Sequence, residues 1–317
     1  SDYSWEQIRK KEIAIELGFL RNHIFLTASY YNAKSDNQIV NYPLPSQTGY
    51  GTILRNFPGV VQNSGLEILL ETVNYKNQDI KWTSSFNMSI PTNRLAEFPL
   101  LEQSSYANSL RIGKSLNSVV GYVYTGVDAA TGEYGFKDLN GDGEIDNNDR
   151  EWVGSTDPKF YGGFSNNLQW KNITIDFLFE FRKQDGLNPI LAAGGLVGRM
   201  MNMPRFVMER WRPGVSDAVY ERFSQQNNGG AAKALAYLTE SGGILTDASF
   251  VRLKNLFIGY DFRMPCMRKA GIDKMQVYIE GQNLLTFTRY AGADPENQSI
   301  GGTSPLRIIA MGIHANF

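Results

Sequence analysis

The chain has 317 residues, 42% of them hydrophobic and 20% charged, a length that allows either two ordinary domains or one large β architecture. A formal net charge of -1 and the lack of a long basic run argue against a nucleic-acid partner. The single cysteine, Cys266, excludes a disulfide framework, the two histidines exclude a His-rich metal site, and no apolar run reaches the roughly 18 residues of a membrane helix.

Apolar residues alternate with polar or small residues in the first third of the chain. The period of two predicts strands that have one apolar face and one polar face. The alternating segments are residues 12–19, 24–31, 66–71 and 80–90. Aromatic residues make up 12% of the chain and glycine is frequent, a composition that favours strands and turns over helices.

The same alternation returns in the second half of the chain, at residues 160–170, 173–182, 255–262, 276–282 and 309–317. It is clearest at residues 173–182, where a helix would place charge on every face. We expect one side of this strand to face lipid: Ile173, Ile175, Phe177, Phe179 and Phe181. Asp176 and Glu180 should face an aqueous lumen. Together the segments predict about nine strands of the length that a tilted membrane strand requires.

The connections between these segments alternate between short and long. The short ones are Arg21-Asn22, 76–79 and Lys171-Asn172, and the long ones are 33–63, 91–159, 184–246 and 288–304. Compact soluble domains rarely carry several loops of that length. Outer-membrane barrels combine short periplasmic turns with long external loops, so we predict that the short turns lie on the periplasmic side.

The last predicted strand ends in an aromatic residue, Phe317, which is also the final residue of the chain. Ile309, Met311 and Ile313 lie on the same side of that strand. A terminal strand of this kind is typical of outer-membrane barrels. The predicted fold is therefore all-β, a transmembrane antiparallel β-barrel.

An acidic segment, residues 138–149, has the ligand spacing of an EF-hand calcium loop. The predicted ligands are Asp138, Asn140, Asp142, the backbone carbonyl of Glu144, Asp146 and Asp149. Gly143 occupies the position where such loops turn sharply. No flanking helix pair is predicted, so we expect a structural Ca²⁺ rather than a sensor, and the alternative is a solvated acidic turn.

Several short motifs follow one another in an order that resembles a known family. They are Asn63-Ser64-Gly65-Leu66-Glu67, residues 121–126, the aspartate-rich loop within 136–149, residues 153–163, 249–255 and 281–288, and Asp294-Pro295-Glu296. Over nearly the whole chain this order resembles the SusC/RagA branch of the TonB-dependent outer-membrane transporters.

The resemblance implies active import of oligosaccharides or peptides across the outer membrane of Bacteroidota-like bacteria. It also implies a SusD-like surface lipoprotein as a lid and TonB as the source of energy. Barrels of this kind have about 22 strands around a plugged lumen. Residues 1–317 would then be the C-terminal part of the barrel, without the plug, the TonB-contacting region and the earlier strands. A nicked precursor, a split gene or a partial chain would each account for this.

Seven carboxylates fall on the polar side of the predicted strands: Glu12, Glu16, Glu67, Glu71, Asp176, Glu180 and Glu280. A polar lumen explains them without catalysis, so we predict that the protein is not an enzyme. We expect them to contact plug side chains and water, with Lys81 and Arg182 as counter-charges. We also interpret Cys266 as an inert turn residue, and residues 204–211 as a loop segment that packs locally or forms a short helix.

A different class of function also fits part of the pattern. A secreted, calcium-stabilised β-sandwich that binds or degrades glycans would have long loops and a calcium motif. Strands of about ten residues with continuous apolar faces, and the terminal Phe317, favour the barrel instead.

Overall fold

A computed structural model of the chain describes residues 3–44, 46–189, 198, 200, 202–203, 205–226, 229–262, 271–272, 274–297 and 303–316. Cys266, Phe317 and Pro204, on which three of the sequence interpretations depend, lie outside the described residues. Within the described part of the chain, no helix is long and apolar enough to cross a membrane.

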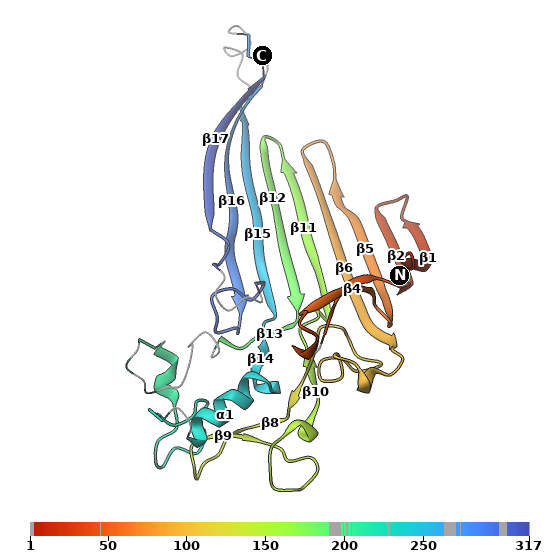
Figure 1. Cartoon of the computed structure of the whole chain (residues 1–317). Helices are drawn as coiled ribbons and strands as arrows, with labels where there is room; N and C mark the ends of the chain where they lie inside the picture. Colours follow the sequence, from red (N-terminus) through yellow and green to blue (C-terminus); the bar gives the residue numbers. More distant parts are fainter. Residues whose placement is uncertain are drawn as a thin grey trace.

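One antiparallel sheet of nine strands dominates the structure (Figure 1). Its strands, in spatial order, are β1 (Gln7–Phe19), β2 (Ile24–Asp36), β5 (Val60–Lys76), β6 (Ile80–Glu97), β11 (Phe160–Trp170), β12 (Ile173–Lys183), β15 (Phe250–Phe262), β16 (Lys274–Thr288) and β17 (Ile308–Asn316). Spatial order follows chain order, so each strand pairs with its predecessor and its successor in this set. The predicted nine alternating strands are confirmed.

The cross-strand register places apolar residues on one face of the sheet. A single row of aligned partners crosses eight strands and contains Leu17, Leu26, Leu70, Phe86, Phe164, Phe179, Leu253 and Leu285. Many residues of this apolar face are exposed, among them Ile13, Ile279 and Met311. Since a water-soluble sheet would cover such a face, its exposure indicates contact with lipid.

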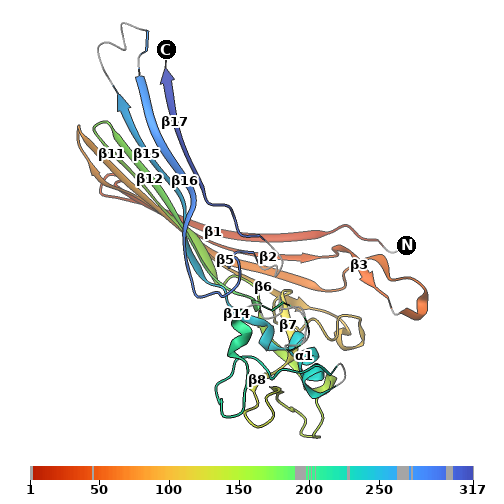
Figure 2. The ribbon, with the colours of Figure 1, turned by 90° about the vertical axis from the view of Figure 1, so that its left-hand side faces the viewer.

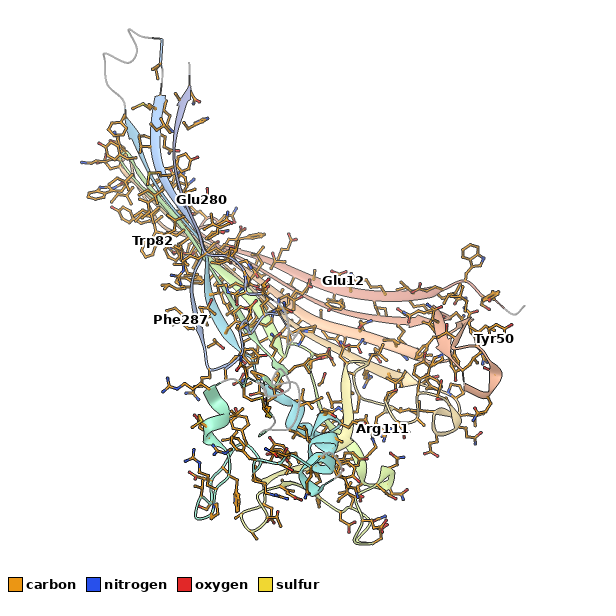
Figure 3. All side chains as sticks on the ribbon, turned by 60° about the vertical axis from the view of Figure 1, so that its left-hand side comes forward. Glu12, Tyr50, Trp82, Arg111, Glu280 and Phe287 are labelled. Atoms are coloured by element: carbon orange, nitrogen blue, oxygen red, sulfur yellow. The ribbon has the colours of Figure 1, made fainter. Side chains whose placement is uncertain are left out.

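The opposite face is polar and lies on the inner side of a curve. Figure 3 shows the sheet nearly edge-on, with Glu280 on the inner side of the curve and with Trp82 and Phe287 on the outer side. Figure 2 shows the same sheet as an open trough. Among the described strands, β1 and β17 form its two edges, and each pairs with one neighbour.

The β-sandwich alternative is wrong, because the nine strands do not pack against a second sheet of similar size. The remaining paired strands in the described chain form only two-stranded sheets. A sandwich requires two inner faces that interdigitate to form a core.

The strands extend beyond the predicted segments at the end with the long loops. β6 continues through Pro91, which the sequence pattern places in a loop, and Pro91 pairs with Gly65 of β5. The pairing of β6 with β11 ends at Ser89. At Pro91, the side of β6 that would face β11 therefore has no paired strand. Proline is tolerated there because no ladder hydrogen bond is lost.

Three of the long connections, which the sequence pattern predicts as loops, contain short strands and helices. The first contains β3 (Ile39–Pro43), η1 (Ser46–Thr48) and β4 (Thr52–Asn56). The second contains η2 (Leu101–Gln103), β7 (Ser118–Tyr122), β8 (Tyr124–Val127), β9 (Tyr134–Phe136), η3 (Asn147–Asp149) and β10 (Arg150–Ser155). The third contains β13 (Asp185–Leu187), η5 (Arg205–Glu209), α1 (Gly230–Thr239), η6 (Gly242–Ile244) and β14 (Leu245–Asp247).

The second and third connections pack together into one unit, which we call the loop module (described residues of 98–159 and 184–249; Figure 1). β7 pairs with β10, and the Tyr122 N–H donates to the Glu240 carbonyl at 3.0 Å. A Cβ at Gly121 would lie 2.0 Å from that carbonyl oxygen, so only glycine permits this approach. The buried apolar clusters lie at this end of the molecule, and the first of them includes the ends of β5 and β6. Phe57, Val61, Leu95, Phe98, Leu101 and Leu110 form this cluster, and Tyr134, Ala234 and Leu238 form the other.

Candidate functional site

A large hollow lies on the polar, concave face of the sheet. It has a volume of about 750 Å³, and its wall includes Glu71, Ser85, Asn167, Asp176 and Glu280. It lies toward the short-turn end of the sheet, and Asn22 of the first short turn is part of its wall. A polar hollow of this size on the inner face of a barrel wall is where a plug or a passing solute contacts the wall.

The carboxylates of the hollow come from aligned positions on neighbouring strands. Asp176 of β12 pairs with Asn167 of β11, whose side-chain amide donates to the Asp176 carboxylate. Phe257 of β15 separates Asp176 from Glu280 of β16, and the amide of Gln282 donates to Glu280 at 3.2 Å. The predicted lumen-side placement of Asp176 and Glu280 is therefore confirmed. Neighbouring amides, rather than cations, bind these two groups.

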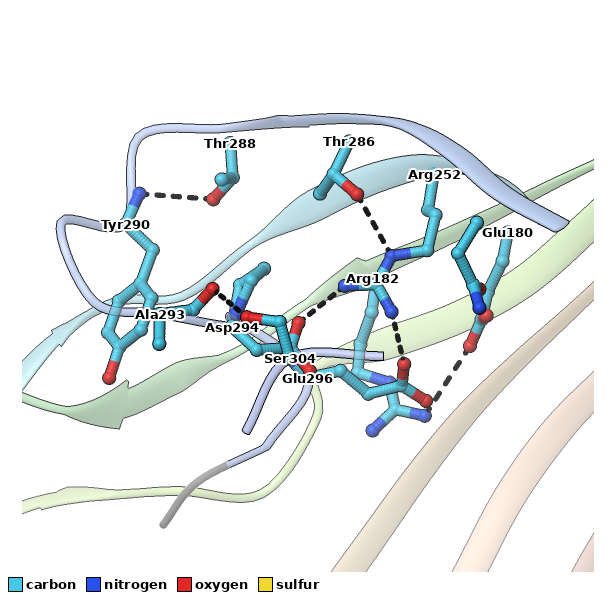
Figure 4. A network of polar contacts seen from close by, with 12 residues as sticks. Glu180, Arg182, Arg252, Thr286, Thr288, Tyr290, Ala293, Asp294, Glu296 and Ser304 are labelled. Carbon is cyan, nitrogen blue, oxygen red and sulfur yellow. Dashed lines mark hydrogen bonds and ion pairs between the residues drawn. The ribbon is translucent and has the colours of Figure 1, made fainter. Parts of the chain in front are cut away.

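A second cluster fixes a loop to the concave face at the loop end of the sheet (Figure 4). Arg252 of β15 is buried, and its guanidinium donates to the Asp294 carboxylate and, at 2.7 Å, to Glu296. It also donates to the Thr286 hydroxyl of β16 at 3.0 Å. A buried arginine with three acceptors is held in one geometry, because the guanidinium fork matches carboxylate oxygens.

The ion pairs continue along the wall from this arginine. The Lys254 ammonium lies 3.6 Å from Glu296 and 3.0 Å from Glu180 of β12, and Arg182 lies 3.8 Å from Glu180. Arg252 and Lys254 are two residues apart and share the concave face, and the β-bulge between Leu253 and Asn255 brings Asn255 to that face as well. Arg182 is thus a counter-charge as predicted. Lys81 forms no ion pair within the described residues, and Lys254 neutralises Glu180 instead.

Two hydrogen bonds to backbone carbonyls complete the attachment of the loop. The buried Gln184 donates its side-chain amide to the Pro295 carbonyl at 2.6 Å, and the Tyr290 hydroxyl donates to the Leu187 carbonyl at 2.7 Å. We call residues 289–297, with these contacts, the latched loop. The sequence motifs contain Arg252, Asp294 and Glu296, but no single-sequence signal pairs residues about 40 positions apart.

The acidic segment 138–149 forms a tight turn in the loop module. Gly143 has φ +87°, the left-handed conformation expected of the turn position. The Asp138 carboxylate accepts the N–H groups of Gly141 and Gly143 at 2.6 and 2.8 Å. Buried Asp149 accepts the N–H groups of Leu139 and Asp146, and these hydrogen bonds lower the pKa of its carboxyl.

The donor set of this turn fits a hard cation in its chemistry, because it offers carboxylate, amide and carbonyl oxygens. Within the described residues, no three acidic, histidine or cysteine side chains converge on one point at metal-binding distances. The Asn140 amide donates to Asp142 at 2.8 Å, and Asp146 accepts from Asn148. The carboxylates therefore close the turn upon itself in this structure.

The segment around residues 204–211 packs locally, as one of the two interpretations proposed. Its described part includes η5, and Val207 is buried. The Trp211 indole N–H donates to the Ala129 carbonyl at 3.0 Å, and its ring lies over Gly132.

A curved antiparallel sheet with a lipid-facing outer face, a polar inner hollow and long loops at one end is part of the wall of an outer-membrane β-barrel. Residues 1–284 match the family model of the TonB dependent receptor-like β-barrel, and the chain belongs to that family. It is a family of transporters and not of enzymes, and its members lie in the outer membrane of Gram-negative bacteria.

The curated relatives come from Bacteroidota. TonB-dependent receptor P3 of Formosa agariphila is 29% identical over 99% of this chain and 34% of its own length. TonB-dependent receptor SusC of Bacteroides thetaiotaomicron is 24% identical over 93% of this chain and 30% of its own length. The chain is therefore SusC/RagA-like, and it spans about a third of the length of the relatives that it matches.

Solved structures show the same fold. A structure of the RagAB peptide transporter superposes with a TM-score of 0.81 at 22% identity, covering 100% of this chain and 36% of the matched chain. The RagAB peptide importer in its open-open state gives a TM-score of 0.78 at 23% identity. These structures confirm the predicted barrel portion.

Proposed function

We propose that the chain forms the C-terminal part of the barrel of a TonB-dependent importer that takes up oligosaccharides or peptides. The single observation that supports this most is the pairing of a continuous apolar outer face with a polar inner hollow of about 750 Å³. The plug and the earlier strands would come from the remaining N-terminal part. A SusD-like lipoprotein would cover the loop module, and TonB would contact the N-terminal region.

The proposed substrate classes follow from the relatives. One matched structure is a peptide transporter. Oligosaccharides are the second class, because the chain resembles the SusC/RagA branch and SusC is one of its relatives. The concave face of this chain carries carboxylates and amides that suit either class, because both offer hydroxyl or N–H donors.

Uptake by living cells tests the proposal. The gene for the whole protein is deleted and restored, and accumulation of labelled oligopeptides and oligosaccharides is measured with and without a protonophore. We expect the deletion to abolish accumulation of one class, and the restored gene to recover it only when the proton gradient is intact. Unchanged accumulation of both classes would refute import as the function.

We further propose that residues 138–149 bind a structural Ca²⁺ through Asp138, Asn140, Asp142, the Glu144 carbonyl, Asp146 and Asp149. The turn is connected to the rest of the loop module, because the Tyr237 hydroxyl of α1 donates to the Ile145 carbonyl at 2.7 Å. A cation that stiffens the turn would thereby stabilise the position of α1.

Calorimetric titration of calcium into the chelator-treated whole protein tests this site. We expect one saturable site, lost in the double variant D138N/D142N. Asp128 supplies a matched control, because it caps a turn of the same module through Ala130 and Thr131 and is not a predicted ligand. D128N should bind calcium normally. Equal calcium binding by the wild type and D138N/D142N would contradict the calcium site. So would an experimental structure, determined in excess calcium, in which the loop is ordered and holds no ion.

A further inference from the structure

Cations gather on the outer face of the sheet at its loop end, over β1, β2, β5 and β6. The register aligns one residue from each of these strands in a row, in the order Arg9, Lys34, Gln62 and Arg94. The next row toward the middle of the sheet contains Lys11, Asn32, Ser64 and Thr92. The third row is apolar, with Ile13, Tyr30, Leu66 and Ile90.

The three rows follow the profile of a membrane surface. Tyr30 is 49% exposed, and it belongs to the apolar outer face that continues to the short turns. Aromatic and apolar side chains at that level belong in the acyl region, and the cations two residues further out belong at the headgroups. We call the charged side chains Arg9, Lys11, Lys34 and Arg94 the cationic patch.

The cationic patch has an excess of positive charge. None of the three rows contains a carboxylate. Arg9, which is largely exposed, lies 3.9 Å from Asp36, outside these rows. Arg94 donates to the neutral side chain of Gln62 at 2.8 Å. Lys11 and Lys34 form no ion pair within the described residues. Lys10 differs, because it points to the opposite face and pairs with Glu12 at 2.7 Å.

On the other half of the loop end, two lysines form ion pairs with aspartates. Lys159 lies 3.3 Å from Asp185, and Lys183 lies 3.0 Å from Asp247. These lysines lie at the same end of the sheet as the cationic patch but carry their own counter-ions. Lys11, Lys34 and Arg94 differ from these two lysines in having no carboxylate partner within the described residues.

A groove connects the cations with the apolar row. It has a volume of about 530 Å³, and it is lined by Arg9, Lys11, Lys34, Ile13, Tyr30 and Asn32, together with Glu12, whose carboxylate pairs with Lys10 at 2.7 Å. Such a groove accommodates a molecule with an anionic head and an apolar tail. A soluble anion would use the cations and leave the apolar end of the groove in contact with other lipids.

We propose that this groove binds an anionic lipid of the outer leaflet, with a phosphate headgroup at Lys11 and Lys34 and an acyl chain along Ile13 and Tyr30. Arg9 and Arg94 flank the headgroup and add attraction from either side. Phosphate is the chemistry that suits the patch, because lysine ammonium groups and arginine guanidinium groups both bind its oxygens. The proposal depends on the outer-membrane location of the barrel and not on the transported substrate.

Native mass spectrometry of the whole transporter in detergent tests the site. The probes are phosphatidylglycerol and phosphatidylcholine with identical acyl chains, so that only the headgroup charge differs. We expect the wild type to retain phosphatidylglycerol preferentially. The variant K11Q/K34Q should lose about 25-fold in affinity, since each cation near an anionic lipid contributes about fivefold.

The matched control is K159Q/K183Q, which removes two lysines that are already ion-paired at the same end of the sheet. It should bind phosphatidylglycerol within about twofold of the wild type. Equal losses in both double variants would overturn the site, as would equal retention of the two lipids by the wild type. Complete displacement of the lipid by inorganic phosphate would also overturn it, because the occupant would then be a free anion. All variants should show the wild-type difference in gel mobility between boiled and unboiled samples, and substrate uptake is measured separately.

Discussion

Glu221 is a buried carboxyl in the loop module, with 1% of its surface exposed and no hydrogen-bond partner for either oxygen in the described structure. Burial and the nearby Glu133 raise its pKa from 4.5 to about 8, against the attraction of Arg222. Two tyrosines face it: burial raises the pKa of Tyr124 to about 12, and it raises that of Tyr134 as well. Arg222 is itself paired with Glu133 at 2.7 Å.

This arrangement predicts a pH-dependent loop module. Between pH 4.5 and about 8 the folded module holds a proton on Glu221 that the unfolded chain releases, so stability falls as pH rises through that window and is level above it. Within that window, the free energy of unfolding of the module should fall by about 1.4 kcal/mol per pH unit. Hydrogen exchange of residues 124–136 and 230–239, corrected for intrinsic rates, measures it. E221Q should remove the slope, and a slope that persists in E221Q would contradict the assignment.

Phe177 and Leu178 are neighbours on β12 that lie on opposite faces of the sheet. Phe177 contacts the rings of Phe164 and Phe179 on the apolar face, with centroid distances of 6.5 and 5.7 Å. Leu178 pairs with Ser165 and Asn255 on the polar face.

The two positions should therefore respond differently to charge. F177R should destabilise the folded barrel by about 2–4 kcal/mol, because the guanidinium would lie in hydrocarbon. L178R, whose side chain enters the aqueous side, should cost much less. Denaturant-dependent refolding into lipid vesicles gives both values, and equal costs would mean that Phe177 does not face lipid.

At the scale of elements, the latched loop follows β16 and is held to β15 by Arg252, which lies 42 residues before Asp294 in the chain. Arg252 and Asp294 are both almost completely buried, with side-chain exposures of 3% and 4%. Breaking a buried ion pair leaves one charge without a partner, which typically costs about 3–5 kcal/mol.

We therefore expect R252Q to release the latched loop. Hydrogen exchange of residues 289–297 should accelerate markedly, and trypsin should cleave after Arg289 in the released loop. K254Q is the control, because Lys254 is one-third exposed and its pairs with Glu180 and Glu296 are partly screened by water. Wild-type protection of the loop in R252Q would show that Gln184 and Tyr290 hold it without the arginine.

At the scale of the whole molecule, the two edge strands of the trough, β1 and β17, require partner strands. β1 and β17 each have one unpaired side in the described sheet, and hydrocarbon offers no hydrogen bonds to an open edge. We expect these edges to pair with strands of the remaining barrel. The complex purified in mild detergent should therefore weigh much more than 35.6 kDa. A stable monomer of that mass with full β content would contradict this expectation.

The position of the loop module also predicts orientation. The short turns near Arg21 and Lys171 lie at the end of the sheet opposite the module (Figure 1). Outer-membrane barrels place short turns in the periplasm, so protease added to whole cells should cleave in the loop module and spare Arg21. Cleavage at Arg21 with an intact module would reverse the orientation.

The sequence by itself determined the strands of the sheet, their lipid and lumen faces and the short turns. The alternation at Ile173–Arg182 is a local pattern. It arises because one side of the strand faces lipid, and it can be read without knowing the rest of the chain. The ends of the strands were less predictable. Near Gln62 and Arg94 the outer face becomes polar, while Val61 and Leu95 on the opposite face join a buried cluster, so the alternation of the membrane segment does not continue.

Only the tertiary structure decided which distant residues meet. The Arg252–Asp294 pair, the burial of Glu221 and the alignment of Arg9 with Lys34 and Arg94 depend on loop paths and on cross-strand register. None of these has a period along the chain, because the partners come from strands and loops joined by connections of different length. A single sequence records the alternation of each strand, whereas the register between strands is set by packing and hydrogen bonding of the whole sheet.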